Sequence, residues 1–242
     1  MPDLKQSQGY RYLRDTKFHR SDMIRRQEVR ISPAGPFKQY PEAERVRLAQ
    51  PFQPEDNFWE LLAKRRSHRQ YAPTPITIET LSLLLWAAQG VTASAGSHLF
   101  RTAPSAGALY PIETYIAAEN IDDLPPGLFH FNIAEFLLER ITSGNSGPLI
   151  AQAALSQGFL ARSGVVFLWS AVLRRNMSKY KERGLRYICL DAGHICQNLL
   201  LAAEALGLKA CPVAAFFDDE LNDLLDLDGD EESILYLAAV GS

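Results

Sequence analysis

The chain has 242 residues, of which 47% are hydrophobic and 22% are charged, and its formal net charge is −3. This composition is ordinary for a soluble globular protein, and the near-neutral charge does not favour nucleic acid as a partner. No apolar run is long enough to span a membrane, and the N-terminal sequence MPDLKQSQGYRYLRD lacks the apolar stretch of a secretory signal. Cys189, Cys196 and Cys211 are expected to be buried thiols in a reducing compartment. We therefore expect a cytoplasmic protein with no membrane partner.

The N-terminal residues 1–54 are polar, basic and rich in proline, and they predict an extended arm that precedes a domain formed by residues 55–242. The first helix of that domain is expected to begin near Asp56 and to bury Phe58, Leu61 and Leu62. A second helix should lie between Thr77 as its cap and Gly90 as its stop. The small residues at 92–97 predict a loop.

The rest of the chain alternates irregularly between helix and strand patterns. Strands are predicted at 112–118, 128–131, 137–141, 165–172 and 234–240. Helices are predicted at 148–155, 187–206 and 218–225. This order favours an α+β fold with a mixed, mostly antiparallel sheet flanked by helices. The longest helix is apolar nearly all round, so most of its faces should be buried, and its polar exceptions Asp191, His194 and Asn198 form one stripe.

Several common sites are excluded by their motifs. The chain has neither G-x-G-x-x-G after a strand nor a phosphate-binding P-loop. The acidic run 226–230 has its glycine at the fourth rather than the sixth position of a calcium loop, and Leu237 stands where the last ligand belongs. Cys189, His194 and Cys196 point to different faces of their helix, which argues against zinc. We expect no metal site.

Three segments hold residue types that suit a ligand site, and the first is the basic run 64–71, KRRSHRQY. Guanidinium groups offer rigid forks of donors to a phosphate or a polarised carbonyl, and the serine adds a hydroxyl. A solvated basic turn explains this pattern equally well. The candidate residues are Arg65, Arg66, Ser67 and Arg69.

The second segment is the small-residue loop 104–111, PSAGALYP. Small side chains let backbone N–H groups approach a flat ligand closely, and the two prolines restrain the loop. Taken alone, the pattern is more typical of an ordinary tight connection into the next strand. Its candidate residues are Pro104, Ser105, Ala106, Gly107 and Leu109.

The third segment is the charged stretch 179–187, in which Lys179 stands beside Tyr180. A lysine next to a tyrosine can act as a general base or a proton relay. A solvated approach to the long helix is the simpler interpretation without further context.

Taken in order, the motifs RRSHRQY, PSAGALYPIETY and KYKERGLRYICLDAGHICQNLLLAAEALGL resemble the SagB-type dehydrogenases within the nitroreductase-like flavoproteins. The resemblance covers nearly the whole chain. It implies a nitroreductase-like layered α+β fold, built as an intertwined homodimer with FMN at the interface. It also implies hydride transfer through the flavin, with NAD(P)H as a transient co-substrate in the reductase branch.

The resemblance also assigns roles to individual residues. Arg65, Ser67 and Arg69 match the residues that hold the FMN phosphate, ribityl chain and pyrimidine edge, and a positive charge at that edge favours anionic reduced flavin. The loop residues Ser105, Ala106, Gly107 and Leu109 match a loop that reaches the flavin from the other subunit. The remaining matches are Gln157 near the pyrimidine and the backbone of Ala214 and Ala215 near the flavin N5.

This sequence departs from the family pattern at two places. Ala214 and Ala215 stand where many relatives have glycine, which would narrow the approach to the ring. The sequence ends at Gly241-Ser242 without the basic C-terminal residues of many nitroreductases, so Arg66 or Arg186 is the expected substitute.

Three functions stay open at this point: an NAD(P)H-dependent reductase of small molecules, an azoline dehydrogenase of modified peptides, and a flavin-binding scaffold without turnover. In the azoline branch, Lys179 and Tyr180 match a pair that removes the proton.

Overall fold

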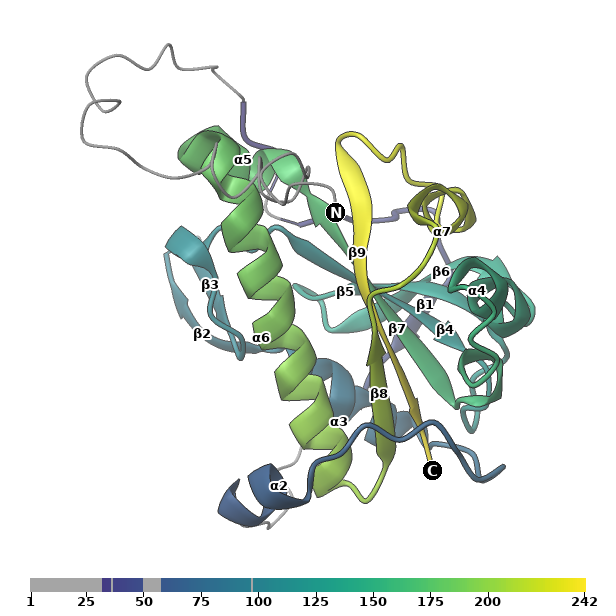
Figure 1. Ribbon diagram of the computed structural model, residues 1–242. Helices are drawn as coiled ribbons and strands as arrows, with labels where there is room; N and C mark the ends of the chain where they lie inside the picture. The colour runs from purple at the N-terminus through teal and green to yellow at the C-terminus, as the bar shows by residue number, and fades with distance from the viewer. Residues whose placement is uncertain (1–31, 36, 50–57, 97) are drawn as a thin grey trace, which may run out of the picture.

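The computed structural model describes residues 32–35, 37–49, 58–96 and 98–242. Within these ranges a seven-stranded sheet forms the centre of the molecule, and every pair of neighbouring strands in it is antiparallel (Figure 1). Its strands are β1 (Arg45–Arg47), β4 (Ile112–Ala118), β5 (Gly127–Asn132), β6 (Leu137–Ser143), β7 (Val165–Val172), β8 (Lys209–Val213) and β9 (Glu232–Gly241). The order across the sheet is β1-β6-β5-β4-β7-β9-β8, so the predicted strand 165–172 lies inside the sheet, as its apolar run requires.

Helices cover both faces of this sheet. The α-helices of the described residues are α2 (Phe58–Lys64), α3 (Ile78–Gln89), α4 (Gly147–Ala153), α5 (Leu173–Tyr180), α6 (Gly184–Ala205) and α7 (Asp218–Leu224). One hydrophobic cluster joins the sheet to α3 and α6, and a second joins its other face to α4 and α7. The predicted α+β fold with a mostly antiparallel sheet is confirmed.

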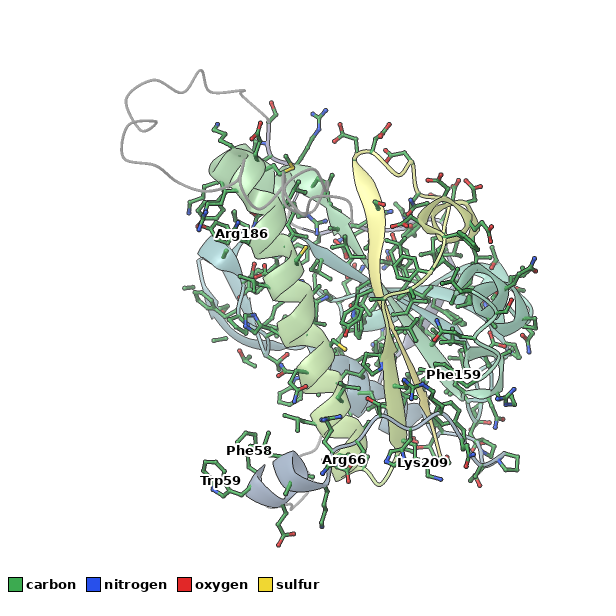
Figure 2. All side chains as sticks on the ribbon, in the orientation of Figure 1. Phe58, Trp59, Arg66, Phe159, Arg186 and Lys209 are labelled. Carbon is green, nitrogen blue, oxygen red and sulfur yellow. The ribbon has the colours of Figure 1, made fainter. Side chains whose placement is uncertain are left out.

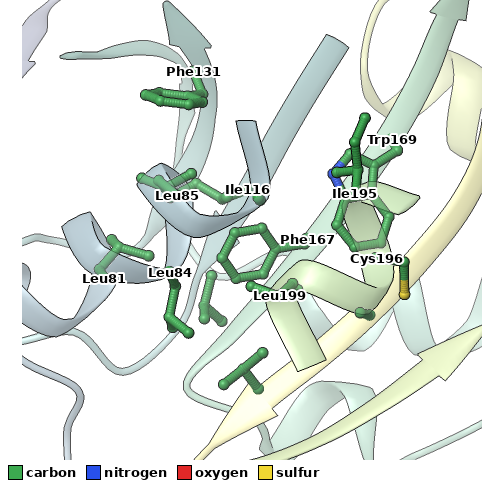
Figure 3. Packing of buried hydrophobic residues seen from close by; sticks show 14 of the residues in the cluster. Leu81, Leu84, Leu85, Ile116, Phe131, Phe167, Trp169, Ile195, Cys196 and Leu199 are labelled. Carbon is green, nitrogen blue, oxygen red and sulfur yellow. The ribbon is translucent and has the colours of Figure 1, made fainter. Parts of the chain in front are cut away.

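The larger cluster shows how one strand serves both faces. Ile112 and Ile116 of β4 pack in the cluster of α3 and α6, whereas Tyr115 and Ala117 pack in the other. Figure 3 shows side chains of α3 and α6 meeting those of β4 and β7 around Phe167. Truncation of a buried ring of this kind to alanine costs about 3–5 kcal/mol.

Both predicted helix boundaries of α3 are confirmed. The Thr77 side chain accepts a hydrogen bond from the Thr80 N–H at 3.2 Å, and Gly90 ends the helix. The stop of α6 is confirmed as well, because Gly207 has a φ of +70° and the Leu208 N–H donates to the Ala203 carbonyl at 2.8 Å.

The expected burial of the first helix is wrong. Phe58 and Leu62 of α2 are 54% and 42% exposed, and no residue of α2 is buried. The reason is that this short helix packs only at the end of α6, so its apolar side chains project from the molecule; Figure 2 shows Phe58 and Trp59 doing so. Asp56 lies outside the described residues.

Two further local predictions are corrected. The segment predicted as a loop at 92–97 contains strand β2 (Val91–Ala95), which pairs with β3 (His98–Arg101) in a separate ribbon. Backbone pairing across a short turn sets this structure, and the small side chains leave no apolar pattern to predict it. Residues 173–180 form α5, a helix that the charged sequence did not suggest.

The longest helix, α6, is less enclosed in the single chain than its composition predicts. Its inner face is buried, but Leu190 is 55% exposed and Cys189, Gly193, His194 and Gln197 are exposed with it. The prediction of a buried thiol is therefore wrong for Cys189, although Cys196 and Cys211 are buried. These residues share one helix face that nothing in the chain covers within the described ranges.

Part of the predicted N-terminal arm joins the sheet. Strand β1 pairs with β6, and Leu48 packs in the core cluster of α3 and α6. Residues 1–31 and 50–57 lie outside the described residues, so the arm boundary at residue 54 stays a prediction. In the part of the chain that the structure describes, no helix is both long and apolar enough to cross a membrane.

Candidate functional site

The basic run lies along the outer edge of β8. Ser67 forms a parallel bridge with Ala210, and the His68 N–H donates to the Ala210 carbonyl at 2.9 Å. Further along, the Ala72 N–H donates to the Ser242 carbonyl at 2.7 Å. The segment therefore continues the sheet edge in extended form, which sets the direction of each basic side chain.

The side-chain hydrogen-bond donors of this segment differ in whether another described residue accepts from them. Among the described residues, the Arg65 guanidinium and the Ser67 hydroxyl form no hydrogen bond or ion pair. Arg66 Nη1 instead donates to the Ala63 and Arg65 carbonyls at 3.1 and 2.7 Å, closing the end of α2. The Arg69 guanidinium lies over the Phe159 ring, 5.8 Å from its centre.

Three chain segments converge beside Arg69. Gln157 Nε2 donates to the Ala215 carbonyl at 3.2 Å, which joins two residues that lie far apart in the sequence. Ala214 and Ala215 are exposed, and within the described ranges their N–H groups have no hydrogen-bond partner. We call this group the basic edge; it comprises Arg65, Arg66, Ser67, Arg69, Gln157, Ala214 and Ala215.

The small-residue loop is held at its start by α6. Ser105 Oγ donates to Asp191 Oδ2 at 2.6 Å, and the Ala106 N–H donates to Asp191 Oδ1 at 3.4 Å. Gly107, Ala108 and Tyr110 all have positive φ, at 66°, 54° and 45°. Such strain persists only where the surroundings enforce it, and it is commonest at ligand-binding sites.

The loop contacts the Lys179–Tyr180 pair directly. A Cβ on Gly107 would lie 2.6 Å from Tyr180 Oη and 2.9 Å from Lys179 Nζ, so a larger residue there would have to displace the ends of both side chains. Lys179 Nζ also lies 5.3 Å from the centre of the Tyr180 ring. Two motifs that are separated in the sequence thus form one group, which we call the loop–pair group: Pro104, Ser105, Ala106, Gly107, Leu109, Lys179 and Tyr180.

The two groups lie at opposite ends of α6 within one chain. The loop–pair group attaches to the helix at Asp191, whereas Ser67 pairs with Ala210, beyond the helix end at Ala205. The helix rises about 1.5 Å per residue, which puts Asp191 roughly 20 Å from the helix end at Ala205. Figure 2 shows Arg66 near the lower end of α6 and Arg186 near the upper end, so these two expected substitutes cannot serve one site of a single chain.

Sequence reasoning missed the buried side chains that hold the loop. Asp191 stood out only as a polar exception on an apolar helix; burial raises its pKa, against the hydrogen bonds from Ser105 and Ala106. Arg101 is buried, lies 4.4 Å from the centre of the Tyr110 ring, and donates to Gln89 Oε1 at 2.7 Å. Burial and the nearby Arg175 charge lower the pKa of Arg101 to about 10, against the attraction of Glu113.

The acidic run has a structural role. Asp228 Oδ1 accepts hydrogen bonds from the N–H groups of Asp230, Glu231 and Glu232 at 2.7–3.0 Å. These bonds lower the pKa of Asp228. The run thus shapes the turn before β9.

Comparison with known proteins identifies relatives by sequence. The model of the nitroreductase family matches residues 62–242. A protein of Methanocaldococcus jannaschii named as a nitroreductase is 37% identical over 182 residues, covering 75% of this chain and 89% of that protein. The trifolitoxin-processing protein TfxB of Rhizobium leguminosarum bv. trifolii is 30% identical over 173 residues, covering 67% of this chain and 46% of that protein. This chain thus spans about half the length of the trifolitoxin relative.

Solved structures agree in fold. A nitroreductase of Anabaena variabilis has a TM-score of 0.79 at 25% identity and covers 96% of this chain, which corresponds to 45% of that chain. The Escherichia coli microcin synthetase McbBCD complex has a TM-score of 0.62 at 19% identity, covering 95% and 85% of the two chains. A nitroreductase of Desulfovibrio desulfuricans in complex with FMN has a TM-score of 0.53 at 20% identity, covering 77% and 86%.

Proposed function

Because this chain belongs to the nitroreductase family, we propose that it is an FMN-dependent oxidoreductase whose two sites are each shared by two copies of the chain. The observation that carries the shared site is the separation of the basic edge from the loop–pair group along α6. Each group alone lacks what the other offers: one has the cations, and the other has the strained loop with its lysine and tyrosine.

The donors of the basic edge fit FMN. Arg65 and Ser67 have donors that no described residue occupies, as a phosphate dianion requires. Arg69 supports the pyrimidine edge, where its charge offsets negative charge on a reduced ring. Gln157 lies close by through its hydrogen bond to Ala215, and the N–H groups of the exposed Ala214 and Ala215 have no partner among the described residues. A solved neighbour in fold contains FMN, which agrees with this assignment.

The chemistry divides between the two groups. When bound, FMN supplies the two-electron acceptor or donor. The basic edge binds and orients its charged end, and the loop–pair group of the second copy closes the other face and excludes water. Lys179 is exposed in the single chain, so the second copy would supply its enclosure. In the dehydrogenation of a substrate, Lys179 Nζ or Tyr180 Oη takes the substrate proton.

An absorbance spectrum of the purified protein, with extraction of its flavin, tests the proposal. We expect a flavin spectrum and FMN in the extract, and anaerobic addition of NADH or NADPH separates the branches. Bleaching by either nucleotide supports a reductase. A colourless protein that takes up no FMN would refute the assignment.

The azoline dehydrogenase is the second candidate, favoured by the Lys179–Tyr180 pair in contact with Gly107 and by the similarity to a trifolitoxin-processing protein. Bleaching of the flavin by a thiazoline-bearing peptide, but by neither nucleotide, would favour it. A substrate on a peptide would also make a modifying complex a partner. The scaffold alternative predicts that the protein binds flavin. It also predicts that changing both Lys179 and Tyr180 leaves every measured redox activity unaltered.

A further inference from the structure

A buried cluster of charged side chains lies beneath the loop–pair group. Glu113 Oε2 and Glu139 Oε2 each lie 3.0 Å from a ring nitrogen of His130, and Arg175 Nη1 forms an ion pair with Glu113. Burial opposes ionisation of Glu113, but Arg175 and His130 outweigh it and hold its pKa at about 2. None of these residues has a part in the chemistry described above.

Arg175 connects this buried cluster to the loop–pair group. It stands on α5 one helical turn before Lys179, and it is 4% exposed. Its Nη1 also donates to the Tyr110 carbonyl at 3.3 Å, at the end of the small-residue loop. One guanidinium therefore ties α5, the loop and strand β4 together.

The same guanidinium is held from the N-terminal side. Arg175 Nε donates to the Gly35 carbonyl at 2.7 Å. Three residues along, Lys38 Nζ donates to Glu232 Oε2 and to Tyr115 Oη, both at 2.8 Å. The Tyr40 N–H donates to Glu139 Oε2 at 3.0 Å. Gly35, Lys38 and Tyr40 lie before residue 62, where the match to the family model begins.

We propose that Arg175, held by the Gly35 carbonyl of a segment that the Lys38–Glu232 ion pair anchors to the sheet, is a positioning residue for the Lys179–Tyr180 pair. The inference rests on the proposed function of that pair. Its physical basis is that a planar fork can hold three oxygens in fixed directions, and that a displacement of about 1 Å at a reacting group can cost about a hundredfold in rate. The N-terminal segment thereby becomes part of the functional site.

The first test reads position without activity. Tyr180 is replaced by 3-fluorotyrosine in the FMN-loaded full chain, and its ¹⁹F spectrum is compared in R175K and in R174K. Arg175→Lys keeps the charge beside Glu113 but cannot reach the Gly35 and Tyr110 carbonyls together. We expect the ¹⁹F signal of residue 180 in the R175K variant to move toward that of free fluorotyrosine. Arg174, exposed and paired with Glu231, is the matched control and should leave the signal unchanged.

A double variant guards against a loss of folding in R175K. E113Q/R175M removes both partners of the buried ion pair, which is far better tolerated than the loss of one. We expect it to fold and to bind FMN, yet to show the displaced Tyr180 signal. An unchanged signal in both R175K and E113Q/R175M would overturn the proposal.

Kinetics test the link to the pair. With a substrate that bleaches the flavin, R175K should lower kcat about tenfold or more at unchanged KM. K38M should also lower kcat. R45M is its control: Arg45 lies on the same N-terminal segment as Lys38, but its exposed ion pair with Glu135 is remote from Arg175, so kcat should not change. In a K179M/Y180F background, R175K should cause no further loss. An equal loss in that background would show that Arg175 acts independently of the pair. No effect of K179M/Y180F itself would instead refute the proposed role of the pair.

Discussion

Gly107 is the residue at which two sequence motifs meet. Its φ of +66° suits glycine, and the space where a Cβ would stand is taken by the ends of Tyr180 and Lys179. The small-residue pattern therefore has two physical causes here, a left-handed backbone and a close contact. The second cause concerns the candidate catalytic pair directly.

We predict that Gly107→Ala displaces the Lys179–Tyr180 pair and lowers kcat as well as stability. The backbone strain should cost about 1–3 kcal/mol, while the displaced pair should lose tenfold or more in rate. Gly207→Ala is the control, because Gly207 has a φ of +70° but no atom within 4 Å of its Cβ position. Thermal unfolding and steady-state kinetics of both variants decide; equal kinetic losses would contradict the contact.

Asp191 is the residue that anchors the other end of the loop. Its replacement by alanine leaves the Ser105 hydroxyl and the Ala106 N–H without their partner. We predict a loss of about 1–3 kcal/mol in unfolding free energy and weaker FMN binding. Asn198→Ala, on the same helix stripe, is the comparison. Urea unfolding and flavin titration measure the two effects, and unchanged FMN affinity would separate the loop from the cofactor.

At the scale of elements, strands β4, β5 and β6 share a buried charged row. Glu113, His130 and Glu139 lie side by side on three neighbouring strands, and their carboxylates hold the imidazole between them. Burial lowers the pKa of His130, but the hydrogen bonds to Glu113 and Glu139 outweigh it and raise the pKa above 6.5. The imidazole therefore links three strands, of which β4 follows the loop and carries Glu113, the ion-pair partner of Arg175 on α5.

This row predicts a pH dependence of stability. Because the pKa of His130 is raised in the folded chain, its stabilising contribution is complete below its unfolded value of 6.5 and is lost as pH rises through the folded value. The lowered pKa of Glu113, at about 2, makes its own contribution complete above 4.5. We expect stability to fall with rising pH above 6.5.

Urea unfolding of the wild type and of His130→Gln at several pH values measures this effect. The variant should lose about 3–5 kcal/mol where His130 is charged, and its stability should fall less with rising pH. His68→Gln, at an exposed position away from α6, controls for histidine loss in general. Identical pH slopes in the wild type and His130→Gln would contradict a charged imidazole in the row.

At the scale of the whole molecule, the exposed face of α6 and the division of the site point to the same assembly. Leu190 and its exposed neighbours form an uncovered helix face, and the two parts of the site lie at the two ends of that helix. A twofold pairing across this face would bring the basic edge of one copy to the loop–pair group of the other.

We predict that Leu190→Asp yields a monomer with little bound FMN, because a charge in a buried helix interface is costly. Leu149→Asp, at a side chain 56% exposed on α4, should stay dimeric. Light scattering and the flavin-to-protein ratio report the outcome. A dimeric, yellow Leu190→Asp protein would place the interface elsewhere.

Mixed dimers test the shared site directly. One chain carries R65A/R69A and the other K179M/Y180F, so a shared arrangement leaves one intact site in each mixed dimer. We predict about half of the wild-type activity for the purified mixed dimer, while each parent dimer retains only a small residual activity. An inactive mixed dimer would mean that each site lies within one chain.

The sequence by itself determined the main strands and the boundaries of α3, because hydrophobic period and capping residues are local signals. It also singled out the residues of both groups, and the ordered motifs predicted the nitroreductase family, which the comparisons confirm. The predicted burial of the apolar side chains of α2 and of the Cys189 thiol was wrong, because burial depends on which segments pack nearby in space.

Only the tertiary structure decided which motifs meet. It brought Gly107 into contact with Tyr180 and Gln157 into contact with Ala215. It also linked Arg175 of α5 to the Tyr110 carbonyl of the loop. These contacts span long sequence separations, and a buried arginine or aspartate has no sequence pattern that names its partner. The length of α6, a rigid rod about 33 Å long, then keeps the two parts of the site apart within one chain.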